Sequence, residues 1–329
     1  MPKVAILDDY AGVALQVADW SPVQTRSEVT VFNRHLTEDE AADALRSFDV
    51  VCTLRERMAF PRTLIERLPN LKLITIVGKS LPNLDMAAAG EHGILVAQSD
   101  FAHPRFRPIR DATPEFAWGL LIATVRHLAE EHRNMRDGGW QSTAGMTLSG
   151  KTLGLLGLGR VGKRMAEYAK AFDMEVLAWS QNLTEEVAAS VGARRVEKAP
   201  LFESSDVVSI HLVLSERTRG LVGQAELASM RPHAYLINTS RGPIVDEAAL
   251  IAALESGRIA GAGLDVYDTE PLPPDHRLRL LANVTLSPHL GYVTREMLGA
   301  FYADTAESVV AWLDGAPIRI ANPEVSQRR

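Results

Sequence analysis

Short apolar runs rich in valine and isoleucine recur along the whole chain, and they restrict its fold more than any other feature. Each run is continuously apolar, which is typical of strands buried on both faces of a parallel sheet. Helical patterns separate most of the runs, so the chain has the rhythm of an open, mostly parallel α/β sheet. The runs lie at residues 4–7, 29–32, 50–54, 71–77, 94–97, 152–156, 175–179, 207–212, 235–238, 261–266 and 284–286.

Residues 99–112 interrupt this rhythm, because Pro104 and Pro108 exclude a regular helix. The segment also carries arginines, and a lid, a subunit contact and a simple surface loop all remain open. A long helix is predicted from Thr113, as its cap, to about Arg136. We predict two doubly wound α/β domains. One is discontinuous and comprises 1–112 and 295–329, and the other comprises 113–294.

Bulk properties exclude several classes of protein. The length of 329 residues suits about two domains. The formal net charge of -6 gives no basic footprint for nucleic acid. Cys52 is the only cysteine, so neither an internal disulfide nor a thiolate metal cluster is possible, and we expect no metal. The N-terminus lacks the apolar core of a signal peptide, and no apolar run could span a bilayer, so we expect a cytoplasmic protein without a membrane segment.

A glycine-rich turn follows the run at 152–156 and opens a helical pattern. In a strand–turn–helix context of this kind, Gly157 permits the tight turn and Gly159 lets the backbone approach a pyrophosphate. Gly162 lets the helix pack closely. Arg160 and Val161 stand at the helix N-terminus, whose amides attract a phosphate. The turn therefore predicts a dinucleotide site.

The acidic residue expected about 20 residues beyond such a turn is missing, and Ser180 and Gln181 stand in its place. A carboxylate there would repel a 2′-phosphate, so its absence removes a barrier to NADP. No Arg or Lys follows within the loop to bind that phosphate. The sequence leaves NAD and NADP open as cofactors, with a slight preference for accepting NADPH.

Three further residues follow predicted strands: Arg241, Glu270 and His289. The planar fork of an arginine fits a carboxylate bidentately, and a histidine can donate a proton near neutral pH. A neighbouring carboxylate favours the charged imidazole. Singly, these residues could be a surface arginine, a turn glutamate and a buried histidine. Their joint order beside a dinucleotide turn predicts hydride transfer to a 2-oxo acid.

Several separate motifs, in one order, resemble those of the D-isomer-specific 2-hydroxyacid dehydrogenases. That family includes phosphoglycerate dehydrogenases and hydroxypyruvate or glyoxylate reductases. The similarity covers nearly the whole chain and is strongest from Gly150 to Tyr292. The matching runs are 154–162, 238–247, 263–267, Glu270-Pro271 and Pro288-His289.

The resemblance implies a flavodoxin-like substrate domain, a Rossmann cofactor domain and a homodimer. It implies that Arg241 binds the substrate carboxylate, that His289 is the general acid and base, and that Glu270 orients the histidine. Asp265 matches the residue that contacts the nicotinamide carboxamide. Two more positions would lie beside the cofactor, namely His211 and Thr239.

The chain also departs from the family pattern. Val213 stands where a proline is usual, two residues after His211. In the substrate loop, at 77–85, only Gly78 and Asp85 match clearly, and Lys79 could add positive charge near a substrate. Gly78 and Lys79 are therefore substrate candidates, and the identity of the acid stays open.

Two other functions remain as alternatives. The protein could be a nicotinamide-sensing binding protein, like the corepressors built on this fold, because fold does not fix function. It could instead oxidise another small anion, such as formate or phosphite. Formate dehydrogenases carry glutamine at the position of Glu270, which argues against formate.

Overall fold

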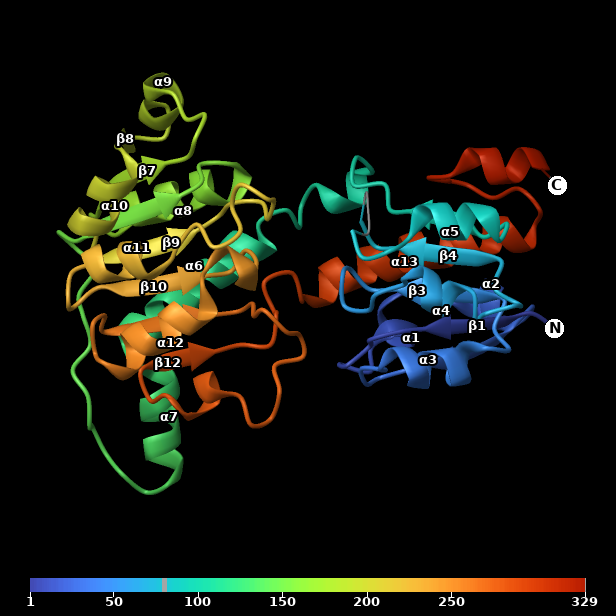
Figure 1. Cartoon of the computed structure of the whole chain (residues 1–329), viewed down its shortest axis with the longest axis horizontal. Helices are drawn as coiled ribbons and strands as arrows, with labels where there is room; N and C mark the ends of the chain where they lie inside the picture. The colour runs from blue at the N-terminus through green and yellow to red at the C-terminus, as the bar shows by residue number, and fades with distance from the viewer. Residues whose placement is uncertain (79–81, 329) are drawn as a thin grey trace. The chain divides into compact units, whose positions relative to one another are not determined.

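The computed structural model describes residues 1–78 and 82–328 and divides into two compact units (Figure 1). Unit 1 comprises Met1–Arg110 and Thr294–Arg329, and unit 2 comprises Asp111–Val293. These limits lie close to the boundaries predicted from the sequence. Each unit contains its own parallel sheet and hydrophobic core.

Unit 1 is built on a five-stranded sheet in the order β2-β1-β3-β4-β5, with all neighbours parallel. Every residue of β3 and β4 is buried, as expected where helices cover both faces of a sheet. The strands are β1 Lys3–Ile6, β2 Glu28–Val31, β3 Val50–Thr53, β4 Leu73–Ile76 and β5 Leu95–Gln98. The predicted doubly wound pattern is thus confirmed in this half of the chain.

The helices of unit 1 show local signals that the sequence carries. Thr37 and Glu40 form a capping box at the start of α3, Glu38–Leu45. The long helix α13, Arg295–Leu313, packs on the unit from the far end of the chain. The shorter helices are α1 Ala14–Val17, α2 Ser21–Gln24, α4 Arg62–Ile65 and α5 Met86–Glu91.

The segment after β5 is anchored on α13 rather than loose. Phe106 is buried, and its ring centroid lies 5.0 Å from that of Phe101 and 5.8 Å from that of Phe301. Arg105 reaches the carboxylates of Asp304, at 3.3 Å, and Glu307, at 2.5 Å. Of the three alternatives for this segment, a lid that moves is therefore the least supported.

Unit 2 contains a seven-stranded sheet in the order β12-β11-β10-β9-β6-β7-β8, again with parallel neighbours. The order reverses at the β6–β9 pair, which is where open α/β sheets bind ligands. The strands are β6 Thr152–Leu156, β7 Glu175–Trp179, β8 Arg194–Arg195, β9 Val207–Ile210, β10 Tyr235–Asn238, β11 Gly261–Leu264 and β12 Val284–Leu286. The sequence did not predict β8, because two arginines give no apolar signal.

The prediction of one helix from Thr113 to Arg136 is wrong. The structure has α6, Ala112–Val125, and α7, Leu128–Arg136, separated at His127 with a φ of 54°. Helix α6 begins before Thr113, so Thr113 does not cap it. A helix cannot continue through a left-handed residue, and α6 packs on β10 and β11 whereas α7 buries no residue. Tertiary packing therefore ends the first helix.

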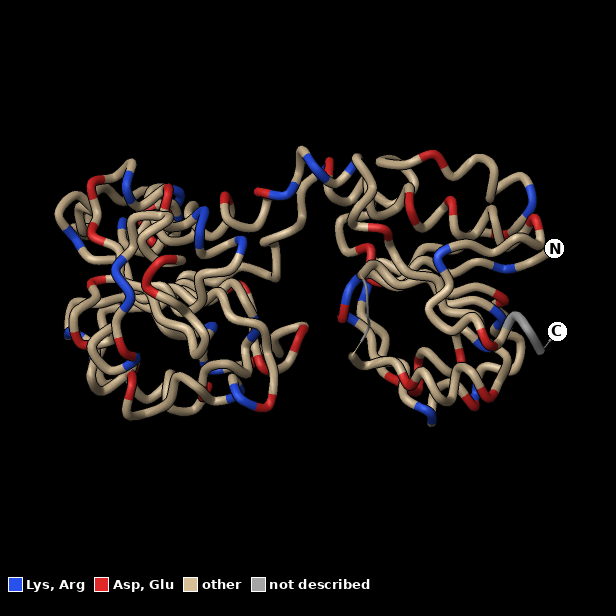
Figure 2. Tube along the Cα trace, turned by 90° about the horizontal axis from the view of Figure 1, so that it is seen from above, with Lys and Arg blue, Asp and Glu red and all other residues tan. Residues whose placement is uncertain are grey.

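The remaining helices of unit 2 are α8 Arg160–Ala171, α9 Glu185–Ala189, α10 Lys198–Ser204, α11 Gln224–Ser229 and α12 Glu247–Glu255. Helix α7 projects beyond the β12 side of the sheet, and the segment after it runs back along the unit to β6 (Figure 1). Charges of both signs are interspersed within each unit (Figure 2), as is usual for a globular protein surface.

Candidate active site

The glycine turn lies at the carboxyl end of β6, where the strand order reverses. Gly157 has a φ of 98°, a backbone conformation that residues other than glycine rarely adopt. Its amide donates to the carbonyl of Trp179 at 2.8 Å, and a Cβ at Gly157 would lie 2.5 Å from the carbonyl oxygen of His211. The turn therefore packs closely between the carboxyl ends of β7 and β9.

The other two glycines of the turn have different surroundings. A Cβ on Gly159 would meet nothing within 4 Å, whereas a Cβ on Gly162 would lie 2.1 Å from the carbonyl oxygen of Gly157. Gly162 is thus needed for packing, and Gly159 faces open space. Helix α8 begins at Arg160, and the first amides of a helix have no intrahelical acceptor. This cradle fits a pyrophosphate, with Arg160 exposed and Val161 half-buried beside it.

Three more predicted cofactor residues lie at neighbouring strand ends. Ser180 directly follows β7. His211 follows β9, and desolvation lowers the pKa of its imidazole to about 3, so His211 is neutral at pH 7 and offers no charge to a phosphate. The buried Thr239 Oγ1 has no hydrogen-bond partner in the described part of the chain. A bound ligand would satisfy this oxygen, so the residues present fit a dinucleotide.

Arg241 is placed by a turn that follows β10. The Asn238 side chain closes this turn, because its Nδ2 donates to the Arg241 carbonyl and its Oδ1 accepts from the Ser240 amide, each at 3.0 Å. The next residue, Gly242, lies directly against the backbone of Tyr267, since a Cβ there would be 2.1 Å from the Tyr267 carbonyl carbon. This close contact joins the segment carrying Arg241 to the segment that leads to Glu270.

Glu270 and His289 form a pair across the ends of β11 and β12. Glu270 Oε2 lies 2.6 Å from His289 Nδ1, while Oε1 accepts from the Tyr267 amide at 3.0 Å. Both carboxylate oxygens are thus engaged, and the imidazole is oriented through Nδ1. The hydroxyl of Tyr267 also lies 2.8 Å from the Ser287 carbonyl, which ties the two strand ends together.

Asp265 holds the loop that carries His289. Its carboxylate accepts from Ser287 Oγ at 2.6 Å, from the Leu290 amide at 2.7 Å and from the Gly291 amide at 2.9 Å. Burial raises the pKa of the Asp265 carboxyl, and these three donors oppose that rise. His289 has a φ of 54°, uncommon outside glycine, so the loop needs this support. The sequence signalled Asp265 only as a cofactor contact, and its part in the loop emerges from the fold.

Comparison with known proteins identifies the family of this chain. The model for the D-isomer specific 2-hydroxyacid dehydrogenase NAD binding domain matches residues 118–291. The chain belongs to the D-isomer-specific 2-hydroxyacid dehydrogenases. It is 37% identical over 276 residues to a glyoxylate reductase of Aeropyrum pernix, covering 81% of each chain. It is also 36% identical over 270 residues to a D-3-phosphoglycerate dehydrogenase of Archaeoglobus fulgidus, covering 82% of this chain and 50% of that one.

Solved structures agree over nearly the full length. A putative D-3-phosphoglycerate dehydrogenase oxidoreductase from Ralstonia solanacearum superposes with a TM-score of 0.89 at 31% identity, covering 99% of this chain and 98% of that one. The apo-structure of D-lactate dehydrogenase from Escherichia coli gives a TM-score of 0.78 at 27% identity, with 97% and 99% covered. The predicted family, fold class and reaction type are confirmed. This dehydrogenase is an oxidoreductase that transfers hydride between a nicotinamide cofactor and 2-oxo acids.

The substrate candidates of the dehydrogenase lie in unit 1. Gly78 follows β4 and has a φ of 153°, while Lys79 lies outside the described residues. At the carboxyl ends of β1 and β3, the structure groups three residues that the sequence did not single out. Tyr10 donates to the buried Asp8 carboxylate at 3.0 Å, and Arg57 Nη1 donates to the Asp8 carbonyl at 2.9 Å. In the sequence, the one feature that could have predicted this group is that its polar residues follow predicted strands.

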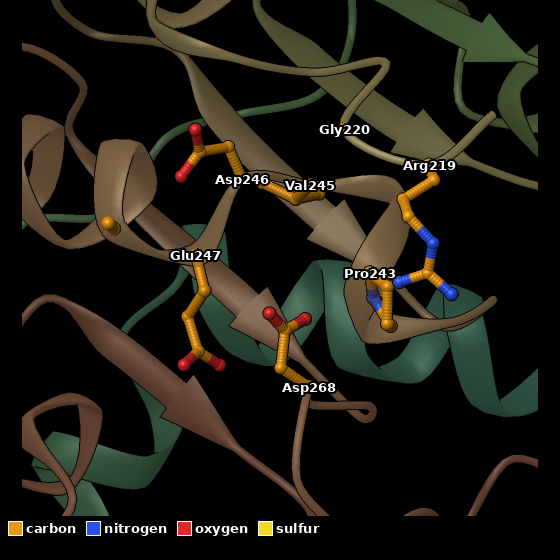
Figure 3. Close-up of a pocket in the computed structure, with 8 residues that line it drawn as sticks. Arg219, Gly220, Pro243, Val245, Asp246, Glu247 and Asp268 are labelled. Carbon is orange, nitrogen blue, oxygen red and sulfur yellow. The ribbon is translucent and has the colours of Figure 1, made fainter. Parts of the chain in front are cut away.

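A separate hollow of about 420 Å³ adjoins the turn after Arg241. In Figure 3 the carboxylates of Glu247 and Asp268 point into it, with Arg219 and Pro243 on the other side. Burial raises the pKa of Asp268, and Glu247 adds to that rise. A site with this excess of carboxylates disfavours an anionic substrate, so we assign none to it.

The described residues contain neither a metal-binding cluster nor a membrane-spanning helix. No group of three or more His, Cys, Asp or Glu side chains in the described ranges is placed to hold a metal ion. None of the helices in those ranges is long and apolar enough to cross a membrane.

The second and third glycines of the turn, Gly159 and Gly162, give a direct test of the cofactor cradle. Gly159→Val fills open space, so the protein should stay folded and lose most of its dinucleotide affinity. Gly162→Val collides with the backbone of Gly157, so it should lower the melting temperature as well. Thermal unfolding and a fluorescence titration with NADH and NADPH would separate the two effects. Unchanged affinity in a folded Gly159→Val protein would contradict the site.

Proposed function

We propose that this dehydrogenase reduces a small 2-oxo acid to the D-2-hydroxy acid, with Arg241, Glu270 and His289 as its catalytic residues. The observation that carries the proposal is the 2.6 Å contact between Glu270 Oε2 and His289 Nδ1, in a loop held by Asp265. Similarity to proteins named glyoxylate reductase supports a small acid.

In the proposed reaction, a nicotinamide cofactor held at Gly157, Gly159 and Gly162 supplies the hydride that reaches C2 of the acid. The Arg241 guanidinium binds the substrate carboxylate through two parallel hydrogen bonds. His289 donates the proton from Nε2 to the forming alkoxide oxygen, because Nδ1 is occupied by Glu270. Glu270 stabilises the imidazolium before the transfer and fixes the ring orientation. Oxidation runs through the same groups in reverse.

The cofactor side of the proposal rests on Ser180, Thr239 and the glycine turn. We propose that NADH and NADPH can both enter, since no carboxylate stands at the ribose position. Asp265 and His211 remain proposed cofactor neighbours, together with Arg160 and Val161. Gly78 and Lys79 remain proposed substrate contacts.

A turnover screen tests this function directly. NADH and NADPH oxidation should be measured against glyoxylate, hydroxypyruvate, pyruvate and bulkier 2-oxo acids. We expect turnover with at least one small acid. Tight cofactor binding without turnover on any acid would instead favour a nicotinamide-sensing binding protein, and turnover on phosphite alone would favour oxidation of another anion.

Substitution of the arginine and the histidine should separate binding from proton transfer. Arg241→Ala should raise KM and lower kcat, with a loss in kcat/KM equivalent to about 2–5 kcal/mol. His289→Gln cannot donate a proton at neutral pH, so kcat should fall by about 10²–10⁴-fold. His276→Gln is the matched control, because His276 also pairs with a glutamate of unit 2, Glu247, at 3.0 Å. Steady-state kinetics of the three proteins would decide, and equal losses in His276→Gln and His289→Gln would contradict the assignment.

Glu270→Gln tests whether this carboxylate acts through His289. Glutamine keeps the length of the side chain but removes the charge beside His289 Nδ1, which lies 2.6 Å from Glu270 Oε2. We expect kcat to fall in both directions, whereas KM for the acid should change little because Arg241 is unaltered. In a His289→Gln background the same substitution should cause no further loss, since two residues that act as one unit are not additive. Steady-state kinetics of the single and double variants would show this, and an additional loss in the double variant would mean that Glu270 does not act through His289.

We also propose that the enzyme is a homodimer that associates through the arm formed by α7 and residues 137–143. Three large apolar side chains are exposed on this arm: Leu128 at 52%, Met135 at 52% and Trp140 at 71%. Large apolar side chains exposed on one short segment mark an interaction surface more often than apolar residues scattered singly do. A second copy is the proposed occupant, in keeping with the family resemblance.

The Glu131 carboxylate holds the end of the arm against α7. Glu131 accepts from the Ser142 amide at 2.9 Å and from the Thr143 amide and hydroxyl at 2.6 Å. The Thr143 hydroxyl and the Ser142 amide lower the pKa of Glu131 to about 2. Because this pKa is depressed, the clamp acts fully above the ordinary glutamate value near 4.5 and is lost only as the pH falls towards 2.

Glu131→Gln should therefore weaken the dimer at pH 7, and Trp140→Ser should weaken it more directly. Glu130→Gln is the control, because Glu130 is the neighbouring glutamate and its one ion-pair contact in the described residues is with His127, at 3.7 Å. Sedimentation velocity at micromolar concentration would give the dimer fraction of each protein. A monomeric wild type would refute the assembly, and equal effects of both glutamine substitutions would refute the role of the clamp.

A further inference from the structure

The edge strand β8 brings a guanidinium to the turn that follows β7. Strand β8 lies beside β7 (Figure 1). Arg195 is in register with Ala178 of β7, two positions before Ser180. Its Nε donates to the carbonyl of Leu183 at 2.9 Å. This arginine is distant in sequence from the loop after β7, so the sequence alone showed no cation there.

Ser180 and Leu183 are the two ends of one tight turn, because the Leu183 amide donates to the Ser180 carbonyl at 3.1 Å. The Cα atoms at the ends of such a turn lie within about 7 Å of each other. The amide of Gly157 donates to the carbonyl of Trp179, so the turn begins beside the proposed pyrophosphate cradle. The Arg195 side chain therefore lies along the turn that starts at the ribose position.

The charges around this turn favour an anion. No residue from 180 through 184 is charged. Arg195 pairs with Glu197 at 3.0 Å, but the Glu197 side chain is 68% exposed, and exposed pairs contribute only about 0.2–1 kcal/mol. The Nη1 of Arg195 donates to no residue in the described ranges. Two carboxylates in the first turn of α9, Glu185 and Glu186, oppose an anion, so the balance depends on Arg195.

We propose that Arg195, together with Ser180, binds the 2′-phosphate of NADPH and makes NADPH the preferred cofactor of this enzyme. The proposal rests on the cofactor site proposed above. A phosphate competes well for this arginine, because charge-assisted pairs of guanidinium with phosphate can be bidentate and are stronger than an exposed contact with one carboxylate oxygen. The bond from Nε to Leu183 can persist while the Nη atoms exchange Glu197 for the phosphate.

The test is the ratio of the NADPH and NADH dissociation constants, measured by fluorescence titration without substrate. Arg195→Ala should weaken NADPH about 10- to 100-fold, the range for losing one hydrogen-bonded charge, and leave NADH within about twofold. Arg194→Ala is the matched control, because Arg194 is the exposed neighbour on the same strand and points to the other face. Arg195→Lys retains the charge and should keep most of the NADPH preference.

Two further variants address the same subsite. Glu197→Gln frees Arg195 and should strengthen NADPH without changing NADH. Ser180→Asp should lower NADPH affinity selectively. A general disturbance of the turn by Arg195→Ala would weaken NADH and NADPH equally and leave the ratio unchanged. A change in the ratio therefore reports the loss of a contact with the 2′-phosphate alone. An unchanged ratio in Arg195→Ala, or a wild type that binds NADH more tightly, would overturn the proposal. The proposed dehydrogenase would survive either result if NADH-dependent turnover of a 2-oxo acid is observed.

Discussion

The buried carboxylate of Asp265 is the interaction on which the rest of the site depends. It engages three donors of the loop after β12, and that loop presents His289 in a left-handed backbone conformation. Such a conformation persists only where the surroundings hold it in place. Once the loop is held, His289 Nδ1 meets Glu270, whose second oxygen is bound by the Tyr267 amide. A proton donor of defined orientation therefore depends on a residue that need not touch the substrate.

Parallel strand pairing explains why the functional groups gather at one edge of unit 2. The carboxyl ends of parallel strands lie on the same edge of the sheet, so the segments after β6, β7, β9, β10, β11 and β12 are brought together. Glycines then allow backbone contacts that no side chain would permit. Gly162 lies against the carbonyl of Gly157, and Gly242 lies against the backbone of Tyr267. The first contact shapes the cofactor cradle, and the second connects the arginine segment to the glutamate segment.

Much of this architecture could be read from the residues because its signals are local. Continuous apolar runs marked the strands of both sheets, and the capping box of Thr37 and Glu40 at the start of α3 is likewise formed by residues close together in the sequence. The features that the sequence did not predict depend on contacts between residues that are distant in the sequence. The break at His127 follows from the packing of α6 against β10 and β11, while α7 buries no residue. Strand β8 contains only Arg194 and Arg195, and its pairing with β7 makes it a strand. Neither feature has a periodic pattern.

The amino-acid sequence was sufficient for the fold class, the family, the reaction type and the identity of Arg241, Glu270 and His289 as candidates. Motifs of fixed spacing carry that information, since their chemistry depends on residue type and on position after a strand. Tertiary structure alone decided which groups meet: Asp265 with the His289 loop, Glu131 with the arm, and Arg195 with the turn after Ser180. These partners are separated along the chain, and only the folding of strands and loops onto one another brings a donor within reach of its acceptor.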